Sequence, residues 1–213
     1  MSRKSIKEIL KIASEMFPDA KCELNYRNLF ELLIAVVLSA QTTDVRVNIV
    51  TKDLFERFPT PESLANAKLS EVEEVIKSIG LYKNKAKSIV GIAKALENKE
   101  VPKSFEELIK LPGVGRKTAN VVLSEGFRIP RIAVDTHVER VSKRLKVVEP
   151  SATPLEVEEA LMAGLDPKDY HQAHHTLIFF GRYHCLARNP NCAVCPLTDS
   201  CRYYEEHYQN KNE

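Results

Sequence analysis

The sequence predicts an all-α fold, and three observations lead to it. Residues that cap helix N-termini precede helix-forming stretches at several points along the chain. Residues 29–38 are apolar on every side except at Glu31, as expected of a central helix that is buried all round. Val, Ile and Phe never alternate with polar residues over a stretch long enough to build a sheet.

Capping patterns set the expected helix boundaries. A Ser three residues before a Glu predicts a capping box, in which the two residues satisfy each other's backbone amides. A Thr directly before a Pro predicts an N-cap followed by the first helical residue. The boxes are Ser5–Glu8, Ser70–Glu73 and Ser104–Glu107, and the Thr-Pro pairs are Thr60-Pro61 and Thr153-Pro154. Gly80 is expected to end a helix over 70–79.

Length and composition limit the class of protein. A chain of 213 residues forms one large domain or two small ones, and Pro130 with the short apolar segment after it suggests a boundary near 131–135. No apolar stretch approaches the roughly 20 residues that span a bilayer, and the N-terminus lacks the apolar core of a secretory signal. We therefore expect a cytoplasmic protein with reduced thiols and no membrane partner. The lone Cys22 is expected to be buried and inert.

Charge is unevenly distributed along a chain whose net charge is only +2. Residues 101–146 carry ten Lys and Arg against five Asp and Glu, whereas residues 147–213 carry five against ten. A second basic run, without an acid inside it, contains Lys83, Lys85, Lys87 and Lys94. Such clusters point to a polyanion such as nucleic acid, although solvated helix faces explain them equally well.

Residues 104–126 have the pattern of a helix-hairpin-helix motif. A short amphipathic helix is expected to end at Leu111, and a second helix starts near Arg116. Gly113 and Gly115 fall in the turn between them, where positive φ or close backbone approach is required. The turn amides and the start of the second helix offer an anion site that suits a DNA phosphate. Ala119 is small enough for the two helices to pack closely. An ordinary helical corner is the alternative.

Lys117 and Asp135 are the candidate catalytic residues. Lys117 lies in the first turn of the second hairpin helix, where the helix N-terminus and Arg116 both disfavour its ammonium form. A phosphate-binding role for this lysine is equally compatible with its position. Asp135, in the sequence VDTH, is the expected N-cap of a helix that carries Arg140, Lys143 and Arg144. A carboxylate facing Lys117 would also stabilise positive charge or accept a proton.

Four cysteines near the C-terminus form the candidate metal centre. Cys185, Cys192, Cys195 and Cys201 have the spacing C-x6-C-x2-C-x5-C. Structural zinc sites usually set two C-x2-C pairs well apart, whereas one pair between two single cysteines suits a cubane iron–sulfur cluster. The spacing therefore favours a [4Fe–4S] cluster over zinc or disulfides. Because a metal centre needs surrounding residues to enclose it, we expect the cysteines to lie in a second lobe of the protein.

The three motifs together resemble a known family. LPGVGRKTAN, then VDTH, then the cysteine spacing resemble the endonuclease III family of helix-hairpin-helix DNA glycosylases, and the resemblance runs essentially from end to end. It implies two helical lobes that flank a DNA cleft. A six-helix barrel would occupy 22–131, with the hairpin at about 104–126, and the cluster domain would comprise 1–21 and 132–213.

The resemblance also implies an activity and its residues. A monomeric, nucleoid-associated enzyme would act on double-stranded DNA that contains oxidised pyrimidines or abasic sites, as a bifunctional glycosylase and lyase. Lys117 would attack C1′ and form a Schiff base before β-elimination, and Asp135 would assist base loss. Gln41 and Leu81 would fill the gap left by an extruded nucleotide. Contacts to DNA are expected from Lys83, Gly113, Gly115, Arg116, Arg140 and Arg144.

Two other functions remain as alternatives. An adenine-excising relative would carry an acid near Ala35 and lack the hairpin lysine, and this chain has Ala35 and Lys117. A non-catalytic iron–sulfur DNA-binding module would have no use for Lys117. The loop between Cys185 and Cys192 has Asn189 and Asn191, where relatives often carry basic residues, so its grip on phosphates is expected to be weaker.

Histidines carry less information. His171, His174 and His175 lack a partnered set of carboxylates in the sequence and are expected to pack or lie at the surface. His137, two residues after Asp135, is a candidate for lining the cleft.

Overall fold

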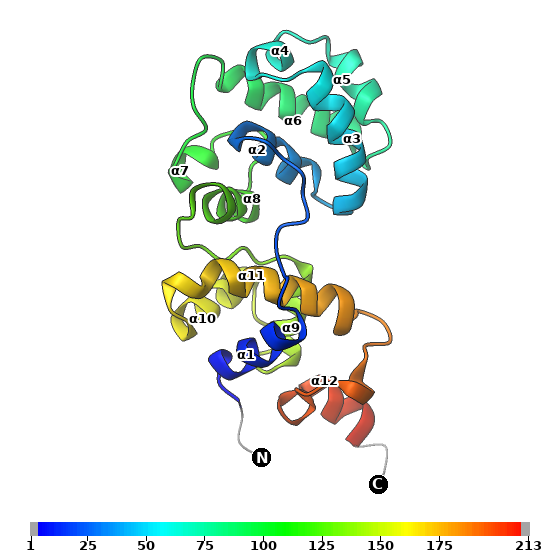
Figure 1. Ribbon diagram of the computed structural model, residues 1–213, viewed down its shortest axis with the longest axis vertical. Helices are drawn as coiled ribbons and strands as arrows, with labels where there is room; N and C mark the ends of the chain where they lie inside the picture. Colours follow the sequence, from blue (N-terminus) through cyan, green and yellow to red (C-terminus); the bar gives the residue numbers. More distant parts are fainter. Residues whose placement is uncertain (1–3, 210–213) are drawn as a thin grey trace. The chain divides into compact units, whose positions relative to one another are not determined.

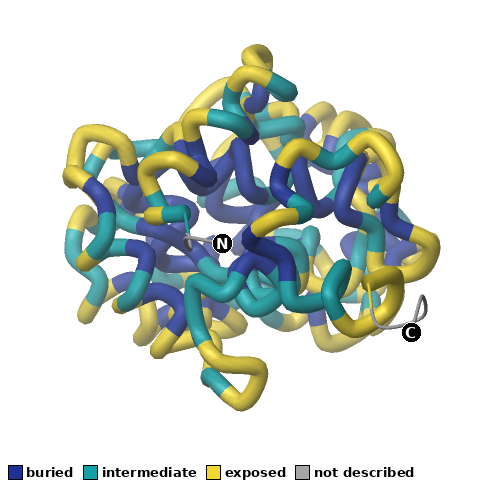
Figure 2. The backbone as a smooth tube through the Cα atoms, turned by 90° about the horizontal axis from the view of Figure 1, so that it is seen from below, coloured by how far each residue is buried: buried dark blue, intermediate teal, exposed yellow. Residues whose placement is uncertain are grey.

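The computed structural model describes residues 4–209, and these residues form helices joined by turns, without a strand. The all-α prediction is therefore confirmed (Figure 1). The chain divides into two compact units. The central unit is Glu23–Ile129, and the terminal unit combines residues 4–22 with residues 130–209. Buried and exposed stretches alternate along the backbone (Figure 2).

The central unit is built around one hydrophobic core. Its helices are α2 (Leu29–Leu38), α3 (Asp44–Arg57), α4 (Pro61–Ala65), α5 (Leu69–Ile76), α6 (Tyr82–Ala95), α7 (Phe105–Leu108) and α8 (Arg116–Val121), and α8 continues as the π-helical η1 (Val122–Gly126). Helix α6 packs against α2, α4 and α5. This arrangement places α6 between the apolar helix α2 and the outer helices.

Helix α2 is the buried helix that the sequence predicts. Nine of its ten residues are buried, and Asn28 caps it by accepting a hydrogen bond from the amide of Glu31. The Glu31 side chain is almost fully buried yet accepts hydrogen bonds from the amide and the guanidinium of Arg27. These bonds satisfy a charge that would otherwise be costly in a core.

Helix capping agrees with the sequence at several sites and disagrees at others. Ser5 and Thr153 form capping boxes, and Thr60 caps α4 with Pro61 at the first helical position. Ser104 caps α7, but the Glu107 carboxylate accepts from the Ser104 hydroxyl instead of its amide. The predicted box is therefore half formed.

Three predicted helix boundaries are wrong. Helix α5 begins at Leu69 and ends at Ile76, so Ser70 lies inside it and the Glu71 carboxylate accepts from the amide of Lys68. Gly80 does not end this helix, because the helix already ends at Ile76; in the turn that follows, Leu81 takes the left-handed conformation. Helix α7 ends at Leu108, and the chain reaches Leu111 by a turn in which the Leu111 amide bonds the carbonyl of Leu108.

The terminal unit has its own hydrophobic core. Its elements are α1 (Ile6–Met16), α9 (Thr136–Arg144), α10 (Pro154–Gly164), η2 (Pro167–Asp169), α11 (Tyr170–Phe179), η3 (Phe180–His184), η4 (Cys192–Val194), η5 (Thr198–Ser200), α12 (Arg202–Tyr204) and η6 (Glu205–Gln209). Helix α1 packs against α10 and α11, which come from the other end of the sequence. Helix α11 continues as the π-helical η3, and this segment packs against α9 directly before Cys185.

Two further expectations concern Cys22 and membranes. Cys22 is half-buried instead of buried, so that expectation is wrong. It lies in a segment that forms neither helix nor strand. No helix in the described part of the chain is long and apolar enough to cross a bilayer.

Candidate DNA-binding hairpin and metal centre

The hairpin turn is shaped by Gly113. Its φ of +75° lies in the left-handed region that favours glycine. A Cβ at this position would lie 2.6 Å from Oγ of Ser88 on α6, so a larger residue has no room. Gly115 differs, because its backbone is extended and a Cβ there would have no neighbour within 4 Å. Gly113 is thus required by the fold, whereas nothing in the fold requires Gly115.

Lys117 lies on the exposed surface of the first turn of α8. Its helix is fixed by buried residues on the opposite side, including Thr118 and Ala119, and Ala119 is fully buried as the close-packing prediction requires. Arg116 precedes it, and the Arg116 guanidinium lies 5.2 Å from the centre of the Phe105 ring. The amine of Lys117 is therefore open to a ligand on a rigid support.

Gln41 and Leu81 share an uncommon backbone conformation. Both have positive φ, 54° and 58°, although neither is glycine. Gln41 is exposed in the turn between α2 and α3, and Leu81 is the N-cap of α6 with 61% of its surface exposed. An apolar side chain this exposed, on a strained backbone, is typical of a contact surface and not of a core. Leu81 is therefore not part of the hydrophobic core.

Lys85 differs in burial from the other lysines of the basic run on α6. Lys83, Lys87 and Lys94 are exposed on α6, but Lys85 is buried. Its ammonium donates hydrogen bonds to the carbonyl oxygens of Leu38 and Ala40 and to the hydroxyl of Thr42. The expectation that Lys85 belongs to a basic cluster for a polyanion is therefore wrong. Helix α6 turns this position toward the end of α2.

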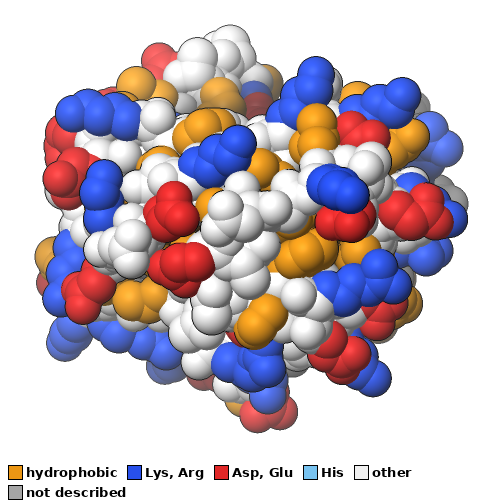
Figure 3. All heavy atoms as spheres, turned by 90° about the horizontal axis from the view of Figure 1, so that it is seen from above, with side chains coloured by type: hydrophobic (Ala, Val, Ile, Leu, Met, Phe, Trp, Pro, Cys, Tyr) orange, Lys and Arg blue, Asp and Glu red, His pale blue; other side chains and the backbone are white. Residues whose placement is uncertain are grey.

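Charged side chains of both signs are mixed on the face shown in Figure 3. Lys and Arg side chains lie among Asp and Glu side chains there, with hydrophobic atoms between them. Charge alone therefore does not single out a nucleic-acid surface on this face. The hairpin turn and two exposed residues with positive φ, Gln41 and Leu81, indicate a nucleic-acid surface more specifically than charge does.

Asp135 is the N-cap that the sequence predicts. Its Oδ1 accepts hydrogen bonds from the amides of His137 and Val138 at 2.9 and 2.8 Å. The described residues donate no hydrogen bond to Oδ2. One carboxylate oxygen thus caps α9, and the second remains available for another role.

His137 and Arg140 are coupled on the first two turns of α9. The Arg140 guanidinium is 3.2 Å from Nδ1 of His137 and donates to the carbonyl oxygens of Gly181 and Cys185. Burial lowers the pKa of His137, and the nearby charge of Asp135 partly opposes this. A neutral His137 therefore suits its position next to a guanidinium.

Arg140 and Arg144 both hold the segment that carries Cys185. The Arg144 guanidinium donates to the Cys185 sulfur and to the carbonyl oxygens of Leu186 and Ala187. It also lies 4.0 Å from the centre of the Tyr203 ring. Sequence reasoning missed this role, although both arginines occupy one face of α9. Their contact with DNA phosphates stays a prediction.

The four predicted metal ligands come together in one place. Cys185, Cys192, Cys195 and Cys201 line a common cavity with Leu145, Phe180 and Tyr204, and none of the described cysteines is in a disulfide. Burial raises the pKa of the Cys192 and Cys201 thiols, and that of Cys195 to about 11. Two of these cysteines are buried and two are half-buried, so their thiolates require a bound cation, and four thiolates match the four irons of a cubane cluster.

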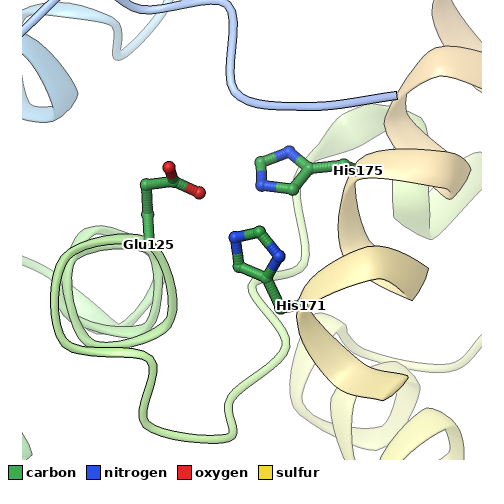
Figure 4. Close-up of side chains that lie close together, drawn as sticks. All are labelled: Glu125, His171 and His175. Atoms are coloured by element: carbon green, nitrogen blue, oxygen red, sulfur yellow. The ribbon is translucent and has the colours of Figure 1, made fainter. Parts of the chain in front are cut away.

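Two of the three histidines of α11 are buried, and His171 is half-buried. His174 and His175 are buried, and Nδ1 of His174 lies 2.9 Å from the carbonyl oxygen of Ala133. His171 and His175 are one turn apart, with ring centres 4.7 Å from each other (Figure 4). The burial of His174 and His175 agrees with the expected packing role.

Comparisons with protein families and with individual proteins point to the same family. The family model of the HhH-GPD superfamily base excision DNA repair proteins matches residues 34–167, and that of the iron-sulfur binding domain of endonuclease III matches residues 185–201. Endonuclease III of Bacillus subtilis (strain 168) is 53% identical over 205 residues, which cover 95% of this chain and 94% of that protein.

Two solved structures are similar over almost the whole chain. One is a trapped endonuclease III–DNA covalent intermediate in an estranged-adenine complex, with a TM-score of 0.93, 53% identity and coverage of 97% of this chain and 98% of that one. The other is a non-covalent endonuclease III–DNA complex, with a TM-score of 0.94, 52% identity and coverage of 98% and 99%.

Proposed function

Since the chain belongs to the endonuclease III family of HhH-GPD base excision DNA repair proteins, we propose which lesions it removes and which residues carry the reaction. The protein is a DNA-binding bifunctional glycosylase and abasic-site lyase. Its substrates are oxidised pyrimidines and abasic sites in double-stranded DNA. It acts as a monomer on chromosomal DNA in the cytoplasm. The barrel domain comprises 22–131, and the cluster domain comprises 1–21 and 132–213.

Lys117 is the proposed nucleophile, and its exposed position on α8 directly after the glycine turn is the observation that carries this assignment. Its free amine attacks C1′ of the damaged nucleotide, and the base leaves with the bonding electrons of the glycosidic bond. The amine then loses a proton and the sugar ring opens, because the C1′–O4′ bond breaks and O4′ takes up a proton. The resulting imine makes the C2′ proton acidic. Loss of that proton breaks the bond to the 3′ phosphate by β-elimination.

Asp135 assists the departure of the base. The capping bonds of Oδ1 fix the carboxylate, and Oδ2 is the oxygen that would stabilise positive charge on the sugar or take up a proton. Gln41 and Leu81 occupy the gap that the extruded nucleotide leaves in the duplex. Lys83, Arg116 and the backbone at Gly113 and Gly115 contact phosphates.

Cys185, Cys192, Cys195 and Cys201 hold a [4Fe–4S] cluster. When bound, the cluster supplies four cationic irons that compensate the buried thiolates and fix the C-terminal segment. The hydrogen bonds from Arg144 and Arg140 attach this segment to α9, the helix that Asp135 caps. The ligands thereby support a catalytic element within the same unit.

Borohydride trapping on a thymine glycol duplex tests the proposal. The wild type is expected to form a covalent adduct, and Lys117→Gln is expected to form none. Lys110→Gln, which removes another exposed lysine of the hairpin, serves as the matched control and should retain the adduct. Base release without an adduct in the wild type would indicate a monofunctional glycosylase. DNA binding without either reaction would indicate a non-catalytic module.

A further inference from the structure

Lys85 occupies a position that is unusual for a lysine. Only 7% of its surface is exposed, and burial lowers its pKa. Its Nζ lies 2.9 Å from the carbonyl oxygen of Leu38, 2.7 Å from that of Ala40 and 2.8 Å from Oγ1 of Thr42. Three acceptors match the three N–H donors of an ammonium group. All three are neutral oxygens, so no carboxylate explains why a cation is placed here.

The acceptors define what the ammonium fixes. Leu38 is the last residue of α2, where unpaired carbonyl groups carry partial negative charge. Ala40 and Thr42 stand on either side of Gln41. The Thr42 hydroxyl lies 3.4 Å from the carbonyl oxygen of Ala40, which closes the turn further. Lys85 therefore clamps both neighbours of an exposed residue in the left-handed conformation.

The same lysine is tied to Leu81. The amide of Lys85 donates to the carbonyl oxygen of Leu81 at 3.1 Å, which forms the first helical hydrogen bond of α6. Leu81 is the other exposed residue with positive φ for which a wedge role is proposed. One residue thus holds the turn of Gln41 with its side chain and the carbonyl of Leu81 with its main chain.

Helix α6 extends this support to the hairpin. Ser88, about one turn after Lys85, lies against Gly113, and Gly91, about one turn further along, lies against Pro112. The Gln41 turn, Leu81 and the hairpin turn are therefore all set by neighbouring residues of one helix. Exposed lysines on the same helix, such as Lys94, contribute nothing to this arrangement.

We propose that Lys85 is a positioning residue that fixes Gln41 relative to Leu81, so that both enter the duplex together when a nucleotide is extruded. This inference rests on the proposed function of the two wedge residues. Without the ammonium, the turn loses three hydrogen bonds and Gln41 is free to leave its left-handed conformation. Lys85 touches neither the duplex nor the reacting atoms, and it acts through Gln41.

Lys85→Met keeps the length and apolar part of the side chain and removes the ammonium. Lys94→Met is the matched control, since it makes the same change at an exposed position of the same helix. Thr42→Val is a milder second variant that removes one acceptor and leaves the lysine in place. Thermal unfolding of each variant shows that it is folded, and Thr42→Val carries the test should Lys85→Met not fold.

The decisive measurement uses a duplex that contains tetrahydrofuran, a stable abasic analogue, with 2-aminopurine opposite it. Insertion of the wedge unstacks this base and raises its fluorescence, and no chemistry at Lys117 is needed. We expect Lys85→Met to reduce the fluorescence change and to weaken binding by about tenfold to a hundredfold. Thr42→Val should shift both in the same direction, and Lys94→Met should match the wild type.

Two further comparisons separate positioning from a general loss of structure. Borohydride trapping on a single-stranded abasic oligonucleotide, which needs no wedge, should proceed at the wild-type rate in Lys85→Met. In a Gln41→Ala background, Lys85→Met should have little further effect, because residues that act through one another are not additive.

A fluorescence change equal to that of the wild type would overturn the proposal. So would an equal loss of trapping on single and double strands, or full additivity with Gln41→Ala. Failure of the wild type to bind the tetrahydrofuran duplex would overturn the proposed function as well. A wild type that binds it but forms no Schiff base would overturn only the lyase assignment, and the Lys85 effect would still support positioning.

Discussion

The Arg144 guanidinium donates a hydrogen bond to the sulfur of Cys185, with 3.3 Å between Nη1 and Sγ. The same group donates to the carbonyl oxygen of Leu186 at 2.7 Å and stacks on Tyr203. A cation that donates to a ligand sulfur stabilises the thiolate and orients it. The arginine therefore belongs to the support of the metal centre.

Arg144→Met is expected to weaken this centre. It removes three hydrogen bonds to the Cys185 segment, so the free energy of unfolding should fall by about 1–3 kcal/mol. The cluster should also bleach faster, which its visible absorbance records during incubation in urea. Arg188→Met, at an exposed position of the neighbouring loop, is the control and should bleach as the wild type does. Equal bleaching in both variants would contradict the role assigned to Arg144.

Asp135→Asn separates capping from catalysis. Asparagine caps helices as well as aspartate, so the variant should retain the wild-type melting temperature. Asp135→Ala should lose about 1 kcal/mol of stability because the amides of His137 and Val138 lose their acceptor. Both variants should slow base release by roughly a hundredfold to ten-thousandfold, since neither has a carboxylate. Wild-type base release by Asp135→Asn would reduce Asp135 to a helix cap.

His137 should make the terminal unit sensitive to acid. Burial lowers its pKa below the ordinary 6.5, while Arg140 and Arg182 also disfavour its protonation and Asp135 favours it. As pH falls through 6.5 toward the lower folded value, the unfolded chain takes up a proton that the folded chain resists. Stability should therefore fall as pH falls through this window.

Urea denaturation of the wild type and His137→Gln at about pH 7.5 and about pH 5.5 checks this, because the two values bracket the ordinary histidine pKa. The wild type should lose more stability than the variant. The pKa of His184 is also lowered by burial, and its contribution cancels because both proteins contain it. An identical loss in the two proteins would exclude His137 as the source.

The two hairpin glycines should respond differently to alanine. Gly113→Ala forces a side chain into the left-handed region and against Ser88, and the backbone alone costs about 1–2 kcal/mol. Gly115→Ala should change stability by less than about 0.5 kcal/mol, because its backbone is extended and its surroundings are open. Thermal unfolding gives both values.

DNA affinity then tests the role of Gly115. If its backbone approaches a phosphate, the alanine variant should bind a duplex more weakly while it stays fully stable. Binding equal to the wild type would show that Gly115 serves neither the fold nor the contact.

Local signals in the sequence predicted much of the fold, and they failed where two signals competed. Ser5, Thr60 and Thr153 cap helices as expected, because each stands directly before a helix-forming stretch. The prediction from Ser70 placed the start of α5 wrongly. The helix begins at Leu69, and the Glu71 carboxylate accepts a hydrogen bond from the amide of Lys68. Capping rules identify a helix start within a few residues but do not choose between adjacent candidates.

The candidate site was predictable by residue type and less so by orientation. The cysteines, Lys117 and Asp135 stand out by spacing and motif. Lys85 was grouped with exposed lysines, although it is spaced four and seven residues before Ile89 and Ile92, which are fully buried. That spacing places all three on one helix face. Arg144 was predicted to contact DNA, because the sequence does not show that the segment around Cys185 packs against α9.

The terminal unit is discontinuous in sequence, and this has a consequence for synthesis on the ribosome. Ile9, Leu10 and Ala13 form the buried face of α1, but α10 and α11, which cover it, come after the whole central unit. The central unit, in contrast, is one uninterrupted segment that can fold as soon as it emerges. At translation rates of about 5–20 residues per second, α1 remains uncovered for roughly 5–20 s while that segment is made. A nascent chain therefore presents the apolar face of α1 to chaperones long before its partners exist, and the metal-binding segment is made later than the central unit.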